Sequence, residues 1–411
     1  MKDRLSTIKG VVSIVLCGVG LIFSTLPLNL FQFLGEGILC RPCQDFDGTI
    51  APDARFIMET VRTNKTQRLP LCHRTQLQQG QWIQEILPRP PYETNFRKCP
   101  SSTVTINNAS RRVFLDYQWQ PNDYQKCDFG RWNATLFCQL TQNAPILIVG
   151  DSLSFEMYLA LVEPFVKSSS NVQFQSLNKP VVQAICDGST YVAFKRTDDL
   201  NRVHETVDID FFPTILILNR GAHYVPDEQL LKELNVTFHH VKEWLQRCRQ
   251  VHGIKCHFYW RTTVPGHVGC KDFTEPVNNL TMMEEWVASH RAPKQTKQGL
   301  VDTHWYDFRH QNVLVSQLLE STFRQDQVPM QQQLISYRIL DAYYLNILRP
   351  DRHVLIKEDC LHSCAPGKAS VYNRLLLHWL RMDRTEQDIQ QITGYTKINP
   401  TWMNRSVTKF F

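Results

Sequence analysis

The sequence contains no block of basic residues interleaved with aromatic ones, no internal repeat and no low-complexity tract. Its net charge is +6, from 45 Lys and Arg residues against 39 Asp and Glu residues, and these charges are spread along the chain. The lack of a basic patch argues against nucleic acid as a partner. What remains is a chain of 411 residues with ordinary globular composition, long enough for one large α/β domain with appendages.

Charge is also absent from residues 10–35, and within them residues 11–23 are dense in Val, Ile, Leu and Gly. At ~1.5 Å per residue this stretch can cross a hydrocarbon core of ~30 Å. Three basic residues precede it within residues 1–9, and Glu36 follows it, so the positive-inside rule predicts a cytosolic tail at 1–9 and a luminal body. A cleaved signal peptide is the alternative, but no small-x-small cleavage site follows and the apolar run continues too far. We therefore expect an uncleaved signal anchor, a single N-terminal transmembrane helix of type II topology.

The cysteine pattern is consistent with a luminal body. Cys17 lies inside the membrane segment, and twelve of the 13 cysteines remain as an even set, which predicts disulfides in an oxidising compartment without fixing their pairing. Zinc at Cys40 and Cys43 would need a second ligand pair that the sequence does not offer, so no metal site is expected. Six glycosylation sequons fit a secretory glycoprotein, and they begin at Asn64, Asn108, Asn133, Asn235, Asn279 and Asn404.

The stretch with the clearest chemical signal surrounds Ser152. Residues 146–149 form a short β-branched apolar run that predicts a buried strand, and Gly150-Asp151-Ser152 follows directly. Apolar residues at helical spacing begin at Phe155. A serine on such a strand-to-helix turn offers a hydroxyl as nucleophile and an amide as oxyanion donor at the carboxyl edge of a sheet. The plainer interpretation is that Ser152 only caps the helix.

Strand and helix signals alternate after Ser152, which predicts a three-layer α/β/α domain with a central parallel sheet over residues 145–411. Further strands are expected at residues 172–177, 191–195, 214–219, 256–261 and 354–356. Helices are expected at residues 230–251, 313–323, 334–348 and 372–380. The preceding part of the chain is predicted to be a stem at residues 36–70 and a Cys-rich, turn-rich, disulfide-tied lobe at residues 71–144.

Residues of catalytic type stand at the predicted strand ends, where sites of open α/β sheets form. His362 is the candidate base that activates Ser152, and Asp359, three residues earlier, could orient its imidazole. Asn219 could donate a side-chain N–H to an oxyanion beside the amide of Ser152. Each has an ordinary alternative, because Asp-x-x-His pairs are common by chance and Asn at a strand end often only forms a turn.

Further candidate substrate-binding residues are Arg261, His223 and Asp151. Arg261 could bind an acidic or hydroxyl-rich ligand or merely pair with a carboxylate, and a histidine such as His223 is often a surface or structural residue.

Together these motifs resemble the SGNH (GDSL-like) hydrolase superfamily, and more closely its PC-esterase and trichome-birefringence-like branch. The motifs are Val-Gly-Asp-Ser-Leu-Ser ending at Ser154, Asp-Cys-Leu-His-Ser-Cys-Ala-Pro-Gly from Asp359, Trp-Arg-Thr-Thr-Val-Pro-Gly-His-Val-Gly-Cys from Trp260, the Arg-x-Asp-x-Leu of Arg196 to Leu200, and Cys72 with Gly80-Gln-Trp82. The family pattern often continues Gly-Asp-Ser-Leu-Ser with Arg-Asn, whereas this chain has Phe155-Glu156.

The resemblance implies a membrane-anchored Golgi enzyme that O-acetylates polysaccharide hydroxyls, with Ser152, His362 and Asp359 as its triad. It also implies a glycine as a further oxyanion donor, for which Gly188 is the candidate. On this basis we expect an O-acetyltransferase that forms an acyl-serine, takes its acetyl group from a donor co-substrate, binds no resident cofactor and uses a glycan as acceptor. A carbohydrate or lipid O-acyl esterase on the same triad is the alternative, and a non-catalytic glycan-binding protein would need the triad to be vestigial. The oligomeric state is left open.

Overall fold

The computed structural model describes residues 69–84, 105–106, 109–110, 117–141, 143–166, 180–200, 203–204, 212–252, 255–291, 293–296, 299–324, 337–354, 359–363 and 368–383. All of them belong to the second of the two units into which the chain divides, Arg68–Phe411. The predicted tail, transmembrane segment and nearly all of the predicted stem lie outside the described residues. Among the helices that are described, none is long and apolar enough to cross a bilayer.

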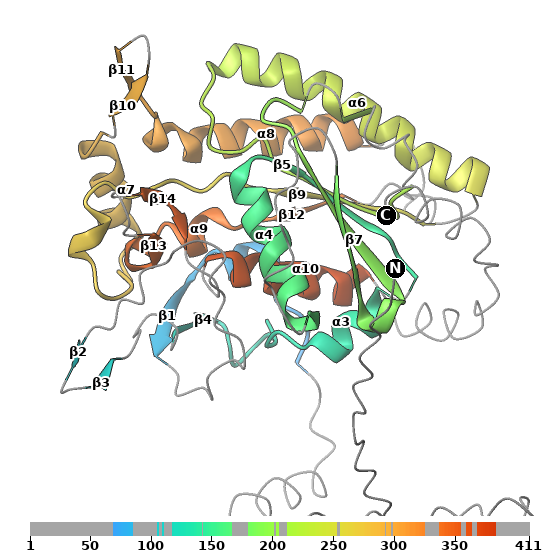
Figure 1. The fold of residues 1–411 in the computed structure, drawn as a ribbon, viewed down its shortest axis with the longest axis horizontal. Helices are drawn as coiled ribbons and strands as arrows, with labels where there is room; N and C mark the ends of the chain where they lie inside the picture. The colour runs from blue at the N-terminus through green and yellow to red at the C-terminus, as the bar shows by residue number, and fades with distance from the viewer. Residues whose placement is uncertain are drawn as a thin grey trace, which may run out of the picture. The chain divides into compact units, whose positions relative to one another are not determined.

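A six-stranded sheet with the order β12-β9-β8-β5-β7-β6 lies at the centre of this unit (Figure 1). Its strands are β5 (Ile146–Gly150), β6 (Val181–Ile185), β7 (Thr190–Arg196), β8 (Ile215–Leu218), β9 (His257–Arg261) and β12 (Tyr337–Leu340). Every residue of β5, β8 and β9 is buried, as expected of strands covered on both faces. β5 and β8 are wholly apolar, whereas β9 also buries His257 and Arg261. Five of the strands run parallel, so their carboxyl ends meet at one edge of the sheet.

The sheet is mixed, so the prediction of a wholly parallel sheet was wrong in one strand. β6 pairs with β7 antiparallel, in the register Val181↔Phe194 to Ile185↔Thr190. The connection between them is the short turn around Cys186–Gly188, whereas a parallel pair needs a crossover of a dozen or more residues.

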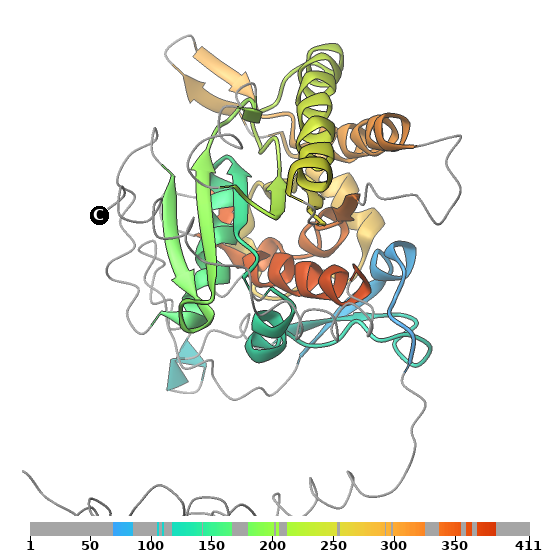
Figure 2. The same cartoon turned by 90° about the vertical axis from the view of Figure 1, so that its right-hand side faces the viewer.

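Helices cover both faces of the sheet, as the alternation of strands and helices predicts. Ile146 and Ile148 of β5 pack in one buried cluster with α4 (Ser152–Val162), α10 (Lys368–Asp383) and α3 (Ala134–Leu140). Leu147 and Val149 point the other way, into a second cluster with α6 (Asp227–His252) and α8 (Phe308–Phe323). Figure 2 shows α10, in red, close to α3, with α6 and α8 on the other side of the sheet.

The remaining elements are short and lie outside the central sheet. They are α2 (Arg74–Leu77), β1 (Gly80–Gln84), β2 (Thr105–Ile106), β3 (Ala109–Ser110), β4 (Tyr117–Pro121), α7 (Leu280–Ser289), β10 (Pro293–Thr296), β11 (Gly299–Asp302), α9 (Tyr343–Asn346), β13 (His353–Val354) and β14 (Asp359–Ser363). The strands among them pair as two-stranded antiparallel ribbons, β1 with β4, β2 with β3, β10 with β11 and β13 with β14.

Two sequence-based elements were wrong. The described residues of the helix predicted at 334–348 form strand β12 followed by the single turn α9. Of the strand predicted at residues 354–356 only Val354 is described, and it does not belong to the central sheet. Val354 ends β13, which pairs only with β14. Both segments are short apolar runs, whose state periodicity alone does not decide. The strand predicted at residues 172–177 lies outside the described residues.

The N-terminal part of the described chain shares its core with the sheet domain. Trp82 of β1 meets Trp119 of β4 edge to face, and its Nε1–H donates to Leu345 O at 2.9 Å. Four disulfides are formed among the described residues, Cys72–Cys127, Cys138–Cys186, Cys248–Cys256 and Cys270–Cys360. The expectation of disulfides is thus confirmed for eight cysteines, while Cys40, Cys43, Cys99 and Cys364 lie outside the described residues.

The buried carboxyl group of Glu163, just after α4, gives a prediction about stability. Its side chain is 3% exposed, and no described residue donates a hydrogen bond to Oε1. Burial raises the pKa of Glu163 to about 8, so between pH ~4.3 and about 8 the unfolded chain loses a proton that the folded chain keeps, and stability falls as pH rises.

We therefore expect Glu163→Gln to be more stable than the wild type by on the order of a few kcal/mol at pH 8, and by much less at pH 5. Urea unfolding at the two pH values measures this difference. An equal gain at both would contradict the assignment of a neutral buried carboxyl.

Candidate active site

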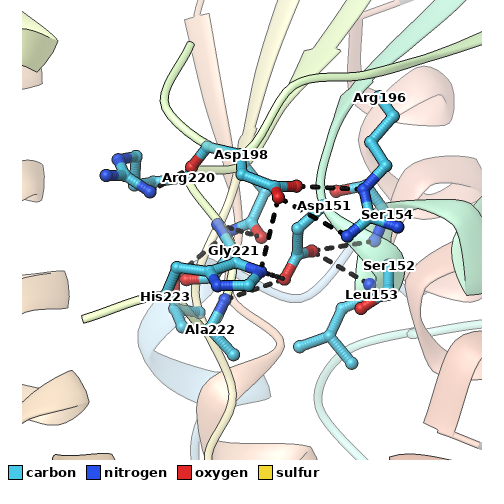
Figure 3. Close-up of polar contacts among 12 residues, drawn as sticks. Asp151, Ser152, Leu153, Ser154, Arg196, Asp198, Arg220, Gly221, Ala222 and His223 are labelled. Atoms are coloured by element: carbon cyan, nitrogen blue, oxygen red, sulfur yellow. Dashed lines mark hydrogen bonds and ion pairs between the residues drawn. The ribbon is translucent and has the colours of Figure 1, made fainter. Parts of the chain in front are cut away.

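Ser152 is the first residue of α4 and follows β5 after a turn organised by Asp151. The Asp151 carboxylate is fully buried, and one oxygen, Oδ1, accepts from the amides of Leu153 at 2.9 Å and Ser154 at 3.4 Å. The other, Oδ2, accepts from the amide of Ala222 at 2.9 Å, in the loop after β8 (Figure 3). Asp151 thus caps the helix and ties two strand ends together. The structure places it beneath the turn and not at a surface that a substrate could reach.

The structure brings together the three residues that the sequence proposes as a triad. The Oγ atom of Ser152 lies 2.7 Å from Nε2 of His362. The other ring nitrogen of His362, Nδ1, lies 2.8 Å from Oδ2 and 3.1 Å from Oδ1 of Asp359. A carboxylate can only accept, so Nδ1 carries the proton and Nε2 is left to accept the serine O–H, which is the tautomer a general base needs.

Asp359 keeps its charge because of these contacts. Burial by itself raises its pKa, but the hydrogen bond from His362, the attraction of that ring when charged, and the amides of His362 and Leu361 together lower the pKa of Asp359 to about 2. The carboxylate is therefore ionised throughout the neutral range. It can hold the imidazole in one orientation and stabilise an imidazolium.

His362 lies on the β13–β14 ribbon, outside the central sheet. The disulfide Cys270–Cys360 attaches β14 to the segment after β9, across 90 residues of sequence. His353 of β13 donates from Nδ1 to the carbonyl oxygen of His362 at 3.2 Å. Sequence reasoning did not identify Cys270 or His353 as supports of the site, because neither pairing leaves a local pattern.

Asn219 has the position that was predicted but a different set of partners. Its side-chain Nδ2 donates to Arg261 O at 2.7 Å and to Thr263 Oγ1 at 3.2 Å. Its Oδ1 accepts from the amide of Gly221 at 2.9 Å and from the Arg261 guanidinium at 2.6 Å. These bonds align the ends of β8 and β9, and both N–H groups of the amide are engaged in them.

Gly188 is not brought to the site. It lies in the turn between β6 and β7, where the carbonyl oxygen of neighbouring Ser189 accepts from the amide of Asn143, just before β5 begins. Ser152 follows the opposite end of β5. The donor that remains from the predicted oxyanion site is the amide of Ser152, whose place at the start of α4 leaves it without an intrahelical acceptor.

The other two candidate substrate-binding residues differ in exposure. Arg261 is fully buried, donates to Ser154 Oγ at 3.1 Å and stacks 4.7 Å from the ring centre of Tyr372. The His223 side chain is 45% exposed at the rim of the nucleophile turn, with Nε2 at 4.0 Å from Asp151 and 3.8 Å from Asp198 (Figure 3). His223 can therefore meet a ligand, whereas Arg261 supports the site from inside. In the described part of the chain, no cluster of three or more His, Cys, Asp or Glu side chains could hold a metal ion.

The contact between Asp359 and His362 gives a direct test. We expect Asp359→Asn to slow the reaction of Ser152 with a fluorophosphonate by about 10²- to 10⁴-fold, because an amide can stabilise the wrong imidazole tautomer. Mass spectrometry of the labelled peptide over time measures the rate.

In the wild type, protonation of Asp359 should not limit the labelling rate anywhere in the neutral range, because the pKa of this carboxyl group is lowered to about 2. An Asp359→Asn variant that is labelled at the wild-type rate would contradict the role of the carboxylate.

Comparison with known proteins finds relatives of one kind. No family model matches the chain. Protein trichome birefringence-like 38 from Arabidopsis thaliana is 25% identical over 353 residues, covering 79% of this chain and 87% of the relative. Protein trichome birefringence-like 23 from the same plant is 23% identical over 374 residues, covering 74% and 80%. Protein trichome birefringence-like 42, also from Arabidopsis thaliana, is 35% identical over 85 residues, covering 20% and 22%. The resemblance expected from the sequence motifs is thereby confirmed, since all three relatives are trichome birefringence-like proteins and two of them match over about three quarters of the chain.

Proposed function

We propose that this protein is an O-acyltransferase that moves an acetyl group from a donor to a glycan hydroxyl through an acyl-serine on Ser152. The observation that carries the proposal is the continuous chain of hydrogen bonds from Ser152 through His362 to Asp359, at 2.7 Å and 2.8 Å. Similarity to trichome birefringence-like proteins supports transfer to a polysaccharide, as the sequence resemblance implies.

In the first step Ser152 attacks the carbonyl carbon of the acetyl donor. His362 Nε2 takes the serine proton as the bond from Oγ to carbon forms. The negative charge on the carbonyl oxygen meets the amide of Ser152 at the start of α4, where the helix dipole adds to the effect. The bond to the donor's leaving group then breaks, and His362 returns the proton to that group.

In the second step His362 removes the proton from an acceptor hydroxyl, whose oxygen attacks the acyl carbon. The bond to Ser152 Oγ breaks, and the serine recovers its proton from His362. Water in place of the sugar hydroxyl would turn the same cycle into hydrolysis, which is the esterase alternative. Since the triad serves both reactions, the choice depends on the family relationship and not on the triad.

We further propose that the catalytic domain faces the lumen of the Golgi, anchored by residues 10–35 as a type II membrane protein. The uncharged stretch behind basic residues supports this topology. The four disulfides support an oxidising compartment.

The test uses the full chain in detergent with an activated acetyl ester as donor and a panel of neutral oligosaccharides as acceptors. We expect an oligosaccharide to gain the mass of acetyl groups and the Ser152 peptide to carry one acetyl transiently. Ser152→Ala should lower transfer by about 10³-fold or more.

Release of acetate from a pre-acetylated oligosaccharide, with no gain on any acceptor, would identify an esterase. If the wild type and Ser152→Ala both show no turnover, the protein is neither an acyltransferase nor an esterase, and a glycan-binding role remains.

A further inference from the structure

We propose that Glu156 is a positioning residue that holds the base of the triad against the nucleophile. Glu156 lies on α4 four residues after Ser152, so one helical turn separates the two side chains on neighbouring parts of one helix. Its side chain is buried, and the residue is 7% exposed. Its Oε1 accepts from the amide of Ser363 at 3.1 Å, and its Oε2 accepts from the hydroxyl of the same residue at 3.1 Å. The proposal rests on the function proposed above.

Ser363 matters because it directly follows His362 on β14. The two bonds from Glu156 therefore join the helix that carries the nucleophile to the strand that carries the base. A carboxylate held at both oxygens by one residue fixes orientation as well as distance. Because Ser152 and Glu156 share a rigid helix, the position of Ser363 relative to Glu156 determines where the ring of His362 lies relative to Ser152 Oγ.

The β13–β14 ribbon needs such a support because the central sheet does not provide one. The ribbon pairs only with itself in the described part of the chain, and a two-stranded ribbon is marginal on its own. The disulfide Cys270–Cys360 and the amide of His267, which donates to Cys360 O at 2.9 Å, fix β14 to the segment beyond β9. The bond from His353 joins the two strands of the ribbon to each other. Glu156 fixes the ribbon to α4, the helix that carries Ser152, and this contact therefore sets the distance from Ser152 to His362.

The chemistry of the contact separates a positioning role from an effect of charge. In Glu156→Gln, the amide oxygen can still accept from the Ser363 amide, and the amide N–H can donate to the Ser363 hydroxyl, so the geometry survives without the charge. In Glu156→Ala both bonds are lost. In Ser363→Ala the hydroxyl bond is lost and the backbone bond remains.

The experiment measures fluorophosphonate labelling of Ser152 in the full chain, as a function of pH, for these three variants and for Glu163→Gln as a matched control. Glu163 is a buried carboxyl group just beyond the same helix, and in the described part of the chain its Oε1 accepts no hydrogen bond, from the ribbon or elsewhere. We expect Glu156→Ala to be labelled about 10- to 100-fold more slowly, since a displacement of about 1 Å can cost 10²-fold.

The test compares the labelling rates of the four variants with the rate of the wild type. Glu156→Gln should return to within about 3-fold of the wild type, Ser363→Ala should lie between them, and Glu163→Gln should match the wild type. The dependence of labelling on pH should flatten in Glu156→Ala, because the base is no longer held in contact with Ser152 Oγ. A merely structural role elsewhere in α4 would leave that profile unchanged.

Three results would overturn the proposal. They are a wild-type rate in Glu156→Ala, a loss in Glu156→Gln as large as in Glu156→Ala, and a wild-type rate in Ser363→Ala if Glu156→Ala does not fold. Failure of the proposed function looks different, because the wild type itself would then be labelled no faster than Ser152→Ala.

Discussion

The position of the nucleophile depends on the buried carboxylate of Asp151. A fully buried charge is costly unless its oxygens are satisfied, and here three amides from two segments satisfy them. The backbone has to approach very closely for this to happen. Gly221, at φ +90°, leaves no room for a side chain, since a Cβ there would lie 2.4 Å from the Asp151 carboxyl carbon. The turn that presents Ser152 is therefore built jointly by the ends of β5 and β8.

The base reaches the site by a different kind of support. Backbone ladders hold the strand ends that carry Asp151 and Asn219. The ribbon that carries His362 is instead held by a disulfide, a backbone bond from His267 to Cys360 O and side-chain hydrogen bonds. Ladder bonds are formed by every residue of a strand, but a side-chain anchor depends on one or two residues. The distance between Ser152 and His362, 210 residues apart in sequence, thus depends on a few individual contacts.

The parts of the site that could be predicted from the sequence are those with local patterns. The buried strand before Gly150 and the helix from Ser152 have clear periodicity, and five of the strands pair in parallel as the alternation with helices indicates. The β13–β14 ribbon has no such pattern, and the short apolar run at residues 354–356 was interpreted as a strand of the central sheet.

Asn219 was expected to donate to an oxyanion because its residue type and its place at a strand end allow it. Its actual acceptors, Arg261 O and Thr263 Oγ1, lie more than 40 residues away in sequence.

The contacts of α4 also account for the two residues that depart from the family pattern just after Gly-Asp-Ser-Leu-Ser. Phe155 and Glu156 stand where the family pattern often has an Arg-Asn pair. In the structure Phe155 packs against Phe194 of β7, with ring centres 5.1 Å apart, and Glu156 bonds to Ser363 of β14. Both partners belong to the protein's own strands. Phe155 therefore packs α4 against β7, and Glu156 bonds α4 to the ribbon that carries His362. Under the role proposed for Glu156, a change at that residue acts on the reaction through the alignment of Ser152 with His362.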